Sequence, residues 1–172
     1  MKIGIFFGSS TDNTTTATEF MKEYLEMNDH EVEMHNIADA DVDKILEFDN
    51  IIIGCPTWHI GELQEDWDSV FLDYEKLDFN GKTAAFFGCG DQIGYPANFL
   101  DAIGMLADPF MKKGGKLIGR IPRDNYQFEG SRALDKDDKL MGLGLDYDND
   151  DEQTCEDYMI EWLEDILDEF PG

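Results

Sequence analysis

The sequence predicts a doubly wound α/β fold, in which helices cover both faces of a parallel sheet. Two observations support this prediction: short apolar runs typical of buried strands recur along the 172 residues, and segments with helical periodicity lie between them. Because 42% of the residues are apolar, the chain can bury a core without disulfides or metal ions. Its length is that of one domain, and we expect residues 1–172 to form it.

The expected strands are the short runs rich in β-branched and aromatic residues. A weaker run at 31–36 alternates apolar with polar residues, as an outer strand does. The polar stretch from 122 to about 140 separates two strand-like segments, so we expect an insertion that splits the last strand. The strong runs are 3–7, 51–55, 84–89 and 117–121, and the second half of the split strand is 140–145.

Three helices are expected from apolar residues at helical spacing opposite charged ones. They follow the first strand, precede Gly114-Gly115 and end the chain, and the acidic stretch 146–152 is expected to be the loop before the last one. Their apolar faces are Ala17, Phe20, Met21, Tyr24 and Leu25; Phe99, Ala102, Ile103, Leu106 and Phe110; and Cys155, Tyr158, Met159, Trp162, Ile166 and Phe170.

The net charge of the chain argues against some classes of binding partner. Thirteen basic against 39 acidic residues give a net charge of −26, which opposes binding to nucleic acid and to anionic membranes. Solubility alone explains this charge, and so does steering toward basic patches on other proteins, with a rate that falls with salt. No apolar run approaches the roughly 18 residues of a membrane span. Without a secretory or transit signal, we expect a cytoplasmic protein.

The cysteines and histidines favour neither a metal site nor a disulfide framework. Cys55, Cys89 and Cys155 lie far apart, with no C-x-x-C pair among them. His59 has no second ligand at metal spacing, so no metal site is expected. Reduced thiols are consistent with the cytoplasm.

The loop after the first strand has the composition of a phosphate site. Residues 8–16 are rich in hydroxyl groups and lead into a helix, whose first N–H groups can hold a phosphate without a formal cation. Residues 9–20 contain no Lys or Arg. Capping of the helix by Ser and Thr explains the same residues. The loop lacks G-x-G-x-x-G and G-K-[ST], which disfavours a dinucleotide-binding Rossmann domain and a nucleoside triphosphatase.

Two further strand-end loops each carry an aromatic residue. Trp58 lies in the turn at 55–63, and Tyr95 ends the loop at 89–95, where Asp91 offers a carboxylate that could accept from a ring N–H. Because the carboxyl ends of parallel strands meet at one edge of a sheet, the two aromatic rings could enclose a flat ligand. The alternative for Trp58 is a lid over the core.

Together these motifs resemble the long-chain flavodoxins. The resemblance rests on G-S-S-T-D-N-T after the first strand, P-T-W-x-I-G-E-L-Q-x-D-W at 56–67 and G-x-G-D-Q-I-G-Y at 88–95, and it continues at 98–104, 126–128 and 142–149. It implies a flavodoxin-like sheet of five parallel strands in the order 2-1-3-4-5. It also implies one noncovalently bound FMN and low-potential electron transfer without substrate turnover.

The resemblance further implies the residues that bind the cofactor. Residues 9–14 match the loop around the FMN phosphate, Trp58 and Tyr95 match the aromatics that flank the flavin, and the backbone at 59–60 matches the segment facing flavin N5. The loop at 90–91 matches the pyrimidine edge. The full set is Ser9, Ser10, Thr11, Asp12, Asn13, Thr14, Pro56, Thr57, Trp58, His59, Ile60, Gly61, Cys89, Gly90, Asp91, Tyr95 and Asp148, with Thr57 and Asp148 near the ribityl chain.

Two residues depart from the family pattern. Asp12 stands where the family usually has Gly, which puts a carboxylate on the phosphate loop and predicts a non-Gly residue at positive φ, a conformation that Asp tolerates. We expect its side chain to turn outward or to cap the helix. Ser9 replaces the usual first Thr and keeps the hydroxyl.

The resemblance implies redox partners with basic docking patches, such as reductases of the ferredoxin/flavodoxin-NADP type and other low-potential donors and acceptors. We expect a monomer. The strongest alternative is an FMN-dependent NAD(P)H quinone or azo reductase of the same fold, but Trp58 and Tyr95 would obstruct hydride access. A phosphoacceptor receiver domain would need an acidic pair where the chain has Gly8, Ser9 and Ser10.

Overall fold

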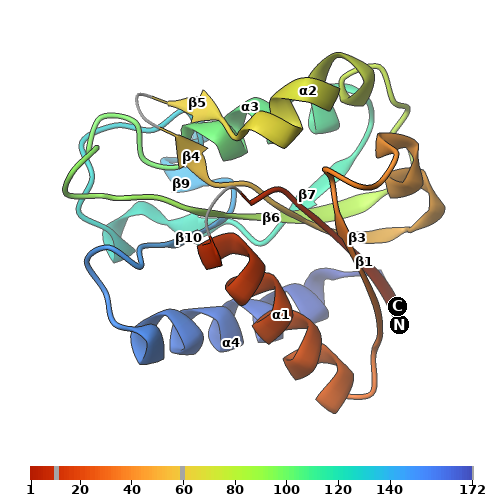
Figure 1. The fold of residues 1–172 in the computed structure, drawn as a ribbon, viewed down its shortest axis with the longest axis horizontal. Helices are drawn as coiled ribbons and strands as arrows, with labels where there is room; N and C mark the ends of the chain where they lie inside the picture. Colours follow the sequence, from red (N-terminus) through yellow and green to blue (C-terminus); the bar gives the residue numbers. More distant parts are fainter. Residues whose placement is uncertain (10–11, 59–60, 172) are drawn as a thin grey trace.

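A six-stranded sheet forms the centre of the molecule in the computed structural model (Figure 1). The structure describes residues 1–9, 12–58 and 61–171, and at residue 58 only the backbone. The strands of this sheet are β1 (Lys2–Phe7), β2 (Glu31–Asn36), β3 (Asn50–Gly54), β6 (Thr83–Cys89), β7 (Lys116–Ile118) and β10 (Leu143–Leu145).

The strand order is β10-β6-β3-β1-β2, and every pair is parallel. β2 lies at the outer edge, as its alternating sequence predicts. β7 pairs with the first half of β6, with Thr83 opposite Lys116, and β10 pairs with its second half, with Phe87 opposite Leu143. The two short strands therefore occupy one position in the sheet. This confirms the predicted order 2-1-3-4-5 and the predicted insertion, which here spans 119–142.

The insertion has regular structure of its own. β8 (Ile121–Pro122) and β9 (Lys139–Leu140) pair antiparallel, and the short 3-10 helix η2 (Arg123–Asn125) follows β8. Farther along, the Tyr126 hydroxyl donates to the carbonyl of Gly144 at 2.9 Å and accepts from its N–H at 3.0 Å. The phenol thus takes the place of a neighbouring strand at the free edge of β10.

Helices cover both faces of the sheet (Figure 1). α1 (Asp12–Met27) and α4 (Glu152–Glu169) pack on one face, with Met21, Phe87 and Trp162 in the core between them and the sheet. α2 (Glu65–Tyr74) and α3 (Asp101–Lys112) pack on the other, over a core that includes Phe86 and Phe110. The strand β6 faces both cores with alternate residues, so its whole length is buried.

Several elements of the described chain were not among the predictions. Besides the elements of the insertion, they are the helix α2, the 3-10 helix η1 (Val42–Glu47), and the antiparallel pair β4 (Thr57–Trp58) and β5 (Glu62–Leu63). α2 begins after Gln64, whose side chain accepts from the N–H groups of Asp66 and Trp67 at 3.2 and 3.3 Å. Because Gln is not one of the usual N-cap residues, the start of this helix carries no familiar signal in the sequence. Within the described ranges, no helix is both long and apolar enough to cross a membrane.

Candidate cofactor site

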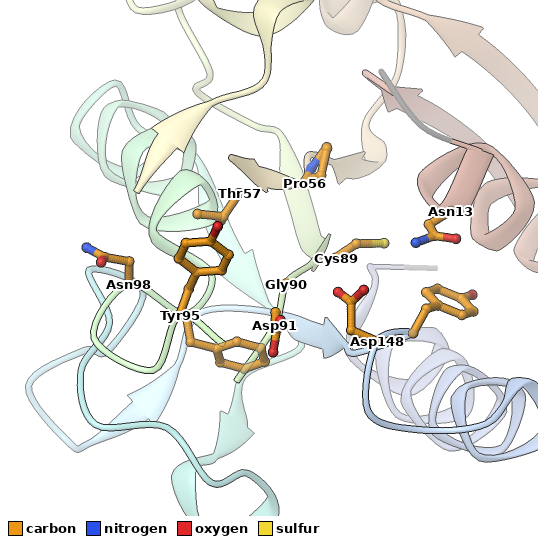
Figure 2. Close-up of a pocket in the computed structure, with 11 residues that line it drawn as sticks. Asn13, Pro56, Thr57, Cys89, Gly90, Asp91, Tyr95, Asn98 and Asp148 are labelled. Carbon is orange, nitrogen blue, oxygen red and sulfur yellow. The ribbon is translucent and has the colours of Figure 1, made fainter. Parts of the chain in front are cut away.

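A cavity of about 360 Å³ opens at the carboxyl ends of β3 and β6, beside the first turn of α1. Figure 2 shows Tyr95 and Asn98 at one end of this cavity, Asn13 at the other, and Cys89, Gly90, Asp91 and Asp148 between them. Strand ends of this kind are where doubly wound folds bind their ligands. The lining residues are Asn13, Pro56, Thr57, Cys89, Gly90, Asp91, Tyr95, Asn98, Phe99, Tyr147 and Asp148.

Near the start of α1, the Thr14 hydroxyl and the Cys89 thiol are both neutral groups. The Thr14 hydroxyl is buried and donates to the Cys89 thiol at 3.6 Å. Burial raises the pKa of Cys89 to about 12, so the thiol is uncharged. Neither Lys nor Arg lines the described part of the cavity. An anion bound here would rely on N–H and hydroxyl donors and on the helix dipole.

Asp12 does not have the positive φ that was expected of it. Among the described non-Gly residues, positive φ occurs at Asp29, Leu100 and Asp138 only. Asp12 is instead the exposed first residue of α1. A carboxylate in the first turn interacts favourably with the positive end of the helix dipole, so ordinary helical geometry accommodates the residue.

At the other end of the cavity an aromatic ring is half exposed. Tyr95 keeps 48% of its surface accessible. Thr57 accepts a hydrogen bond from the Ala102 N–H at 3.1 Å through its Oγ1, which holds the start of α3 against this loop. Gly61 has φ +77°, and a side chain there would also collide with the Asp101 carboxylate. The backbone at residue 61 therefore requires glycine.

Asp91 organises its own loop. Its Oδ1 accepts from the N–H groups of Ile93 at 3.1 Å and Gly94 at 2.6 Å, and from Asn149 Nδ2 at 2.8 Å. The Gly94 bond contributes most to lowering the pKa of Asp91. The sequence suggested that this carboxylate could accept from a ring N–H, whereas in the structure Oδ1 already serves the turn that presents Tyr95.

A buried carboxylate that sequence reasoning did not select joins three loops. Asp146 is 1% exposed, and its two oxygens accept from the Gln92 N–H, the Asn149 N–H and the Asn149 amide at 2.8 to 3.1 Å. Gln92 in turn accepts from the Gln127 N–H at 2.6 Å. The network ties the Tyr95 loop to the end of β10 and to the insertion. Its signal in the sequence is an acidic residue placed directly after a buried strand.

The pKa of Asp148, which lines the middle of the cavity, is shifted in the opposite direction to that of Asp91. Partial desolvation at the cavity wall raises its pKa, and the nearby charges of Asp91 and Asp146 raise it further. The middle of the cavity is therefore an unfavourable place for additional negative charge.

The cavity brings together part of the predicted set. Three lining residues, Asn98, Phe99 and Tyr147, were not predicted, while the predicted residues Ser9, Asp12, Thr14 and Gly61 lie outside the lining. Ser10, Thr11, His59, Ile60 and the side chain of Trp58 fall outside the described part of the chain. The predicted residues that line the cavity are Asn13, Pro56, Thr57, Cys89, Gly90, Asp91, Tyr95 and Asp148.

Comparison with known proteins gives one consistent result. A sequence model described as "Flavodoxin" matches residues 5–162. Flavodoxin from Nostoc sp. (strain PCC 7120) is 41% identical over 169 residues, which are 98% of this chain and 97% of that protein. The chain belongs to the flavodoxin family. Flavodoxin 1 from Escherichia coli K12 is 39% identical over 166 residues, covering 96% and 93% of the two chains.

Solved flavodoxin structures agree with this assignment. The crystal structure of Fusobacterium nucleatum flavodoxin bound to flavin mononucleotide has a TM-score of 0.90 and 28% identity, and it covers 99% of each chain. Flavodoxins are electron carriers, so this chain transfers electrons and is not an enzyme with its own substrate. The alternative of an NAD(P)H-dependent reductase is not favoured.

Proposed function

We propose that this flavodoxin holds FMN in the strand-end cavity and carries electrons on it between redox proteins. One observation carries the proposal: the first turn of α1 and the half-exposed ring of Tyr95 lie at the two ends of a single cavity. A helix N-terminus suits a phosphate and an exposed aromatic face suits a flat ring. FMN has both groups, joined by a ribityl chain.

The residues present fit this cofactor in charge and in shape. Residues 9–14 would hold the phosphate through N–H and hydroxyl donors, and Tyr95 and Trp58 would lie against the two faces of the ring. The loop at 89–91 would face the pyrimidine edge, with Pro56, Gly61 and the backbone at 59–60 near N5, and Thr57 and Asp148 near the ribityl chain. When bound, FMN supplies the redox chemistry, and the protein positions it and limits its contact with water.

We also propose that the potential of the bound cofactor is low. Asp91 and Asp148 line the cavity, Asp146 is buried behind it, and the chain has a net charge of −26. Adding an electron adds negative charge near these carboxylates. In a partly desolvated site, that repulsion is stronger than in water.

The proposal extends to the protein as a whole. Residues 1–172 would act as one domain, because the cores on both faces share a single sheet. We expect this domain to be cytoplasmic and monomeric. Its acidic surface would meet basic docking patches on reductases of the ferredoxin/flavodoxin-NADP type and on other low-potential donors and acceptors.

The test begins with apoprotein and FMN. Binding is expected to quench the fluorescence of FMN at one equivalent, and the reconstituted protein should not oxidise NAD(P)H until a separate reductase is added. A chain that stays colourless in excess FMN would exclude the proposed cofactor. Steady NAD(P)H oxidation by the purified protein alone would instead identify a reductase.

A further inference from the structure

Tyr147 lines the cavity and packs against the core beneath α1, but it belongs to none of the loops assigned to FMN. It lies two residues beyond β10, and Cys89 of the cavity lining belongs to the same core. Its ring is partly buried against the core beneath α1 and α4. The ring therefore has a packing role, but packing does not explain a hydroxyl at this position.

The Tyr147 hydroxyl has no hydrogen-bond partner among the residues that the structure describes. Two phenols that point into the protein are satisfied by backbone groups: Tyr74 donates to the Leu106 carbonyl at 2.7 Å, and Tyr126 bonds both backbone groups of Gly144. The Tyr147 hydroxyl differs, because it is not fully buried and faces the cavity. A hydroxyl at the cavity wall without a protein partner is available to a ligand.

No positively charged side chain lines the described cavity. A phosphate at its α1 end would carry close to two negative charges, and Asp148 adds a nearby carboxylate. Each neutral donor at this end would therefore contribute a charge-assisted hydrogen bond.

We infer that the Tyr147 hydroxyl donates a hydrogen bond to the phosphate of FMN. This inference rests on the proposed function, since it needs FMN in the cavity with its phosphate at the α1 end. Burial, and after it the surrounding thiols and carboxylates, raise the pKa of Tyr147, so the phenol keeps its proton at neutral pH. Tyr147 would then be a specificity residue that favours FMN over riboflavin.

The test compares Tyr147→Phe with the unchanged protein for two ligands, FMN and riboflavin. The variant keeps the ring and its packing, so the melting temperature of the apoprotein should not change. We expect the Kd for FMN to rise roughly ten-fold, as for the loss of one hydrogen bond to a charged group, while the Kd for riboflavin changes less than two-fold. Tyr158→Phe on α4 is the matched control, because Tyr158 packs against the same core but does not line the cavity.

The possible results separate a failure of this inference from a failure of the proposed function. If the unchanged protein binds no FMN, the proposed function fails. If it binds FMN and the variant binds it equally well, or if FMN and riboflavin weaken by the same factor, the phosphate contact is wrong. Inorganic phosphate supplies a second readout: it should stabilise the unchanged apoprotein against heat more than Tyr147→Phe. Equal stabilisation of the two proteins would also overturn the inference.

Discussion

The carboxylates around the cavity show how two identical side chains acquire opposite effects from their neighbours. The Asp91 carboxylate accepts three hydrogen bonds from its surroundings and its pKa is lowered, mainly by the Gly94 N–H. The pKa of Asp148 is raised because its carboxylate is partly desolvated and lies near the charges of Asp91 and Asp146. Ionisation therefore stabilises the fold at Asp91 and destabilises it at Asp148.

This contrast predicts opposite pH profiles for two Asp→Asn variants of the apoprotein. A lowered pKa gives stability that is present above the unfolded pKa and lost as pH falls through the folded one, so Asp91→Asn should melt lower at pH 7 and approach the unchanged protein in acid. A raised pKa has the opposite sign, so Asp148→Asn should melt higher at pH 7, and its advantage should vanish once the carboxyl is protonated. Melting curves from pH 3 to 7.5 check both predictions. If the two variants shifted the melting temperature at pH 7 in the same direction, the opposite pKa shifts of Asp91 and Asp148 would be contradicted.

Tyr95 gives a prediction that separates binding from stability. Because its ring is half exposed, Tyr95→Ala should change the free energy of unfolding by less than about 0.5 kcal/mol. Loss of one stacking face should weaken FMN binding about ten-fold. The control is Ile93→Ala, since Ile93 is 55% exposed on the same loop but does not line the cavity. Urea unfolding measures the stability of each variant, and titration by FMN fluorescence measures its FMN binding. Equal losses of FMN binding in the two variants would argue against stacking at Tyr95.

At this scale, the sequence predicted the residues that stand in recognisable loops and missed those that the fold brings in. Asn13, Tyr95 and Asp148 lie within the motifs and line the cavity, and their binding of FMN stays a prediction. Tyr147 could not be selected, because its neighbours in the cavity come from α1 and β6, far away in the chain. The bonds made by Asp91 and Asp146 depend on side-chain direction, which no spacing pattern contains.

At the scale of elements, the buried strands were the most predictable part of the chain. β1, β3 and β6 begin within one residue of the predicted runs, because strands covered on both faces are continuously apolar. α2 was missed because its exposed Leu72 interrupts the amphipathic pattern and its cap is an unusual one. The insertion was located from its polarity, but its contacts with the site were not.

Those contacts make the insertion a support for the cofactor loop. Glu129 and Gly130 donate through their N–H groups to the Pro96 carbonyl at 2.7 and 2.9 Å, next to Tyr95. Gln127 donates to Gln92 from the same segment. Residues 127–130 therefore bond to both sides of the turn that presents Tyr95.

Tyr126 tests the edge contact of the insertion. In Tyr126→Phe, the N–H and carbonyl of Gly144 both lose their partner at a buried position, so the free energy of unfolding should fall by about 1–3 kcal/mol. Tyr24→Phe is the control, because its hydroxyl bonds the exposed Glu164 and its loss should cost less than about 0.5 kcal/mol. Urea unfolding of both variants is the measurement. Equal costs would mean that the β10 edge does not depend on this phenol.

At the scale of the whole molecule, the charge is unevenly distributed along the chain. Eight of the thirteen basic residues lie between 112 and 139, from the end of α3 through the insertion, and the rest of the chain has five basic and 34 acidic residues. The carboxyl ends of β3 and β6, where the cavity opens, belong to the acidic part. A partner with a basic patch would therefore be drawn to the cavity side more than to the insertion.

Ionic strength distinguishes steering from mere solubility. If the acidic surface guides encounters, the association rate of the FMN-loaded protein with a reductase that carries a basic patch should fall at least ten-fold between about 10 and 300 mM salt. Stopped-flow mixing measures this rate, and a neutral small-molecule reductant provides the control. An association rate that does not change with salt concentration would leave solubility as the explanation of the net charge.

The divided last strand has a consequence for protein engineering. Since β7 and β10 pair with the same neighbour one after the other, the intervening segment leaves the sheet and returns to it at nearly the same place. Such a segment can be lengthened without rethreading the chain, provided that Tyr126 stays at the β10 edge and Phe128 and Leu140 stay in the core. A peptide inserted at the exposed residues 136–138 should therefore leave the sheet intact.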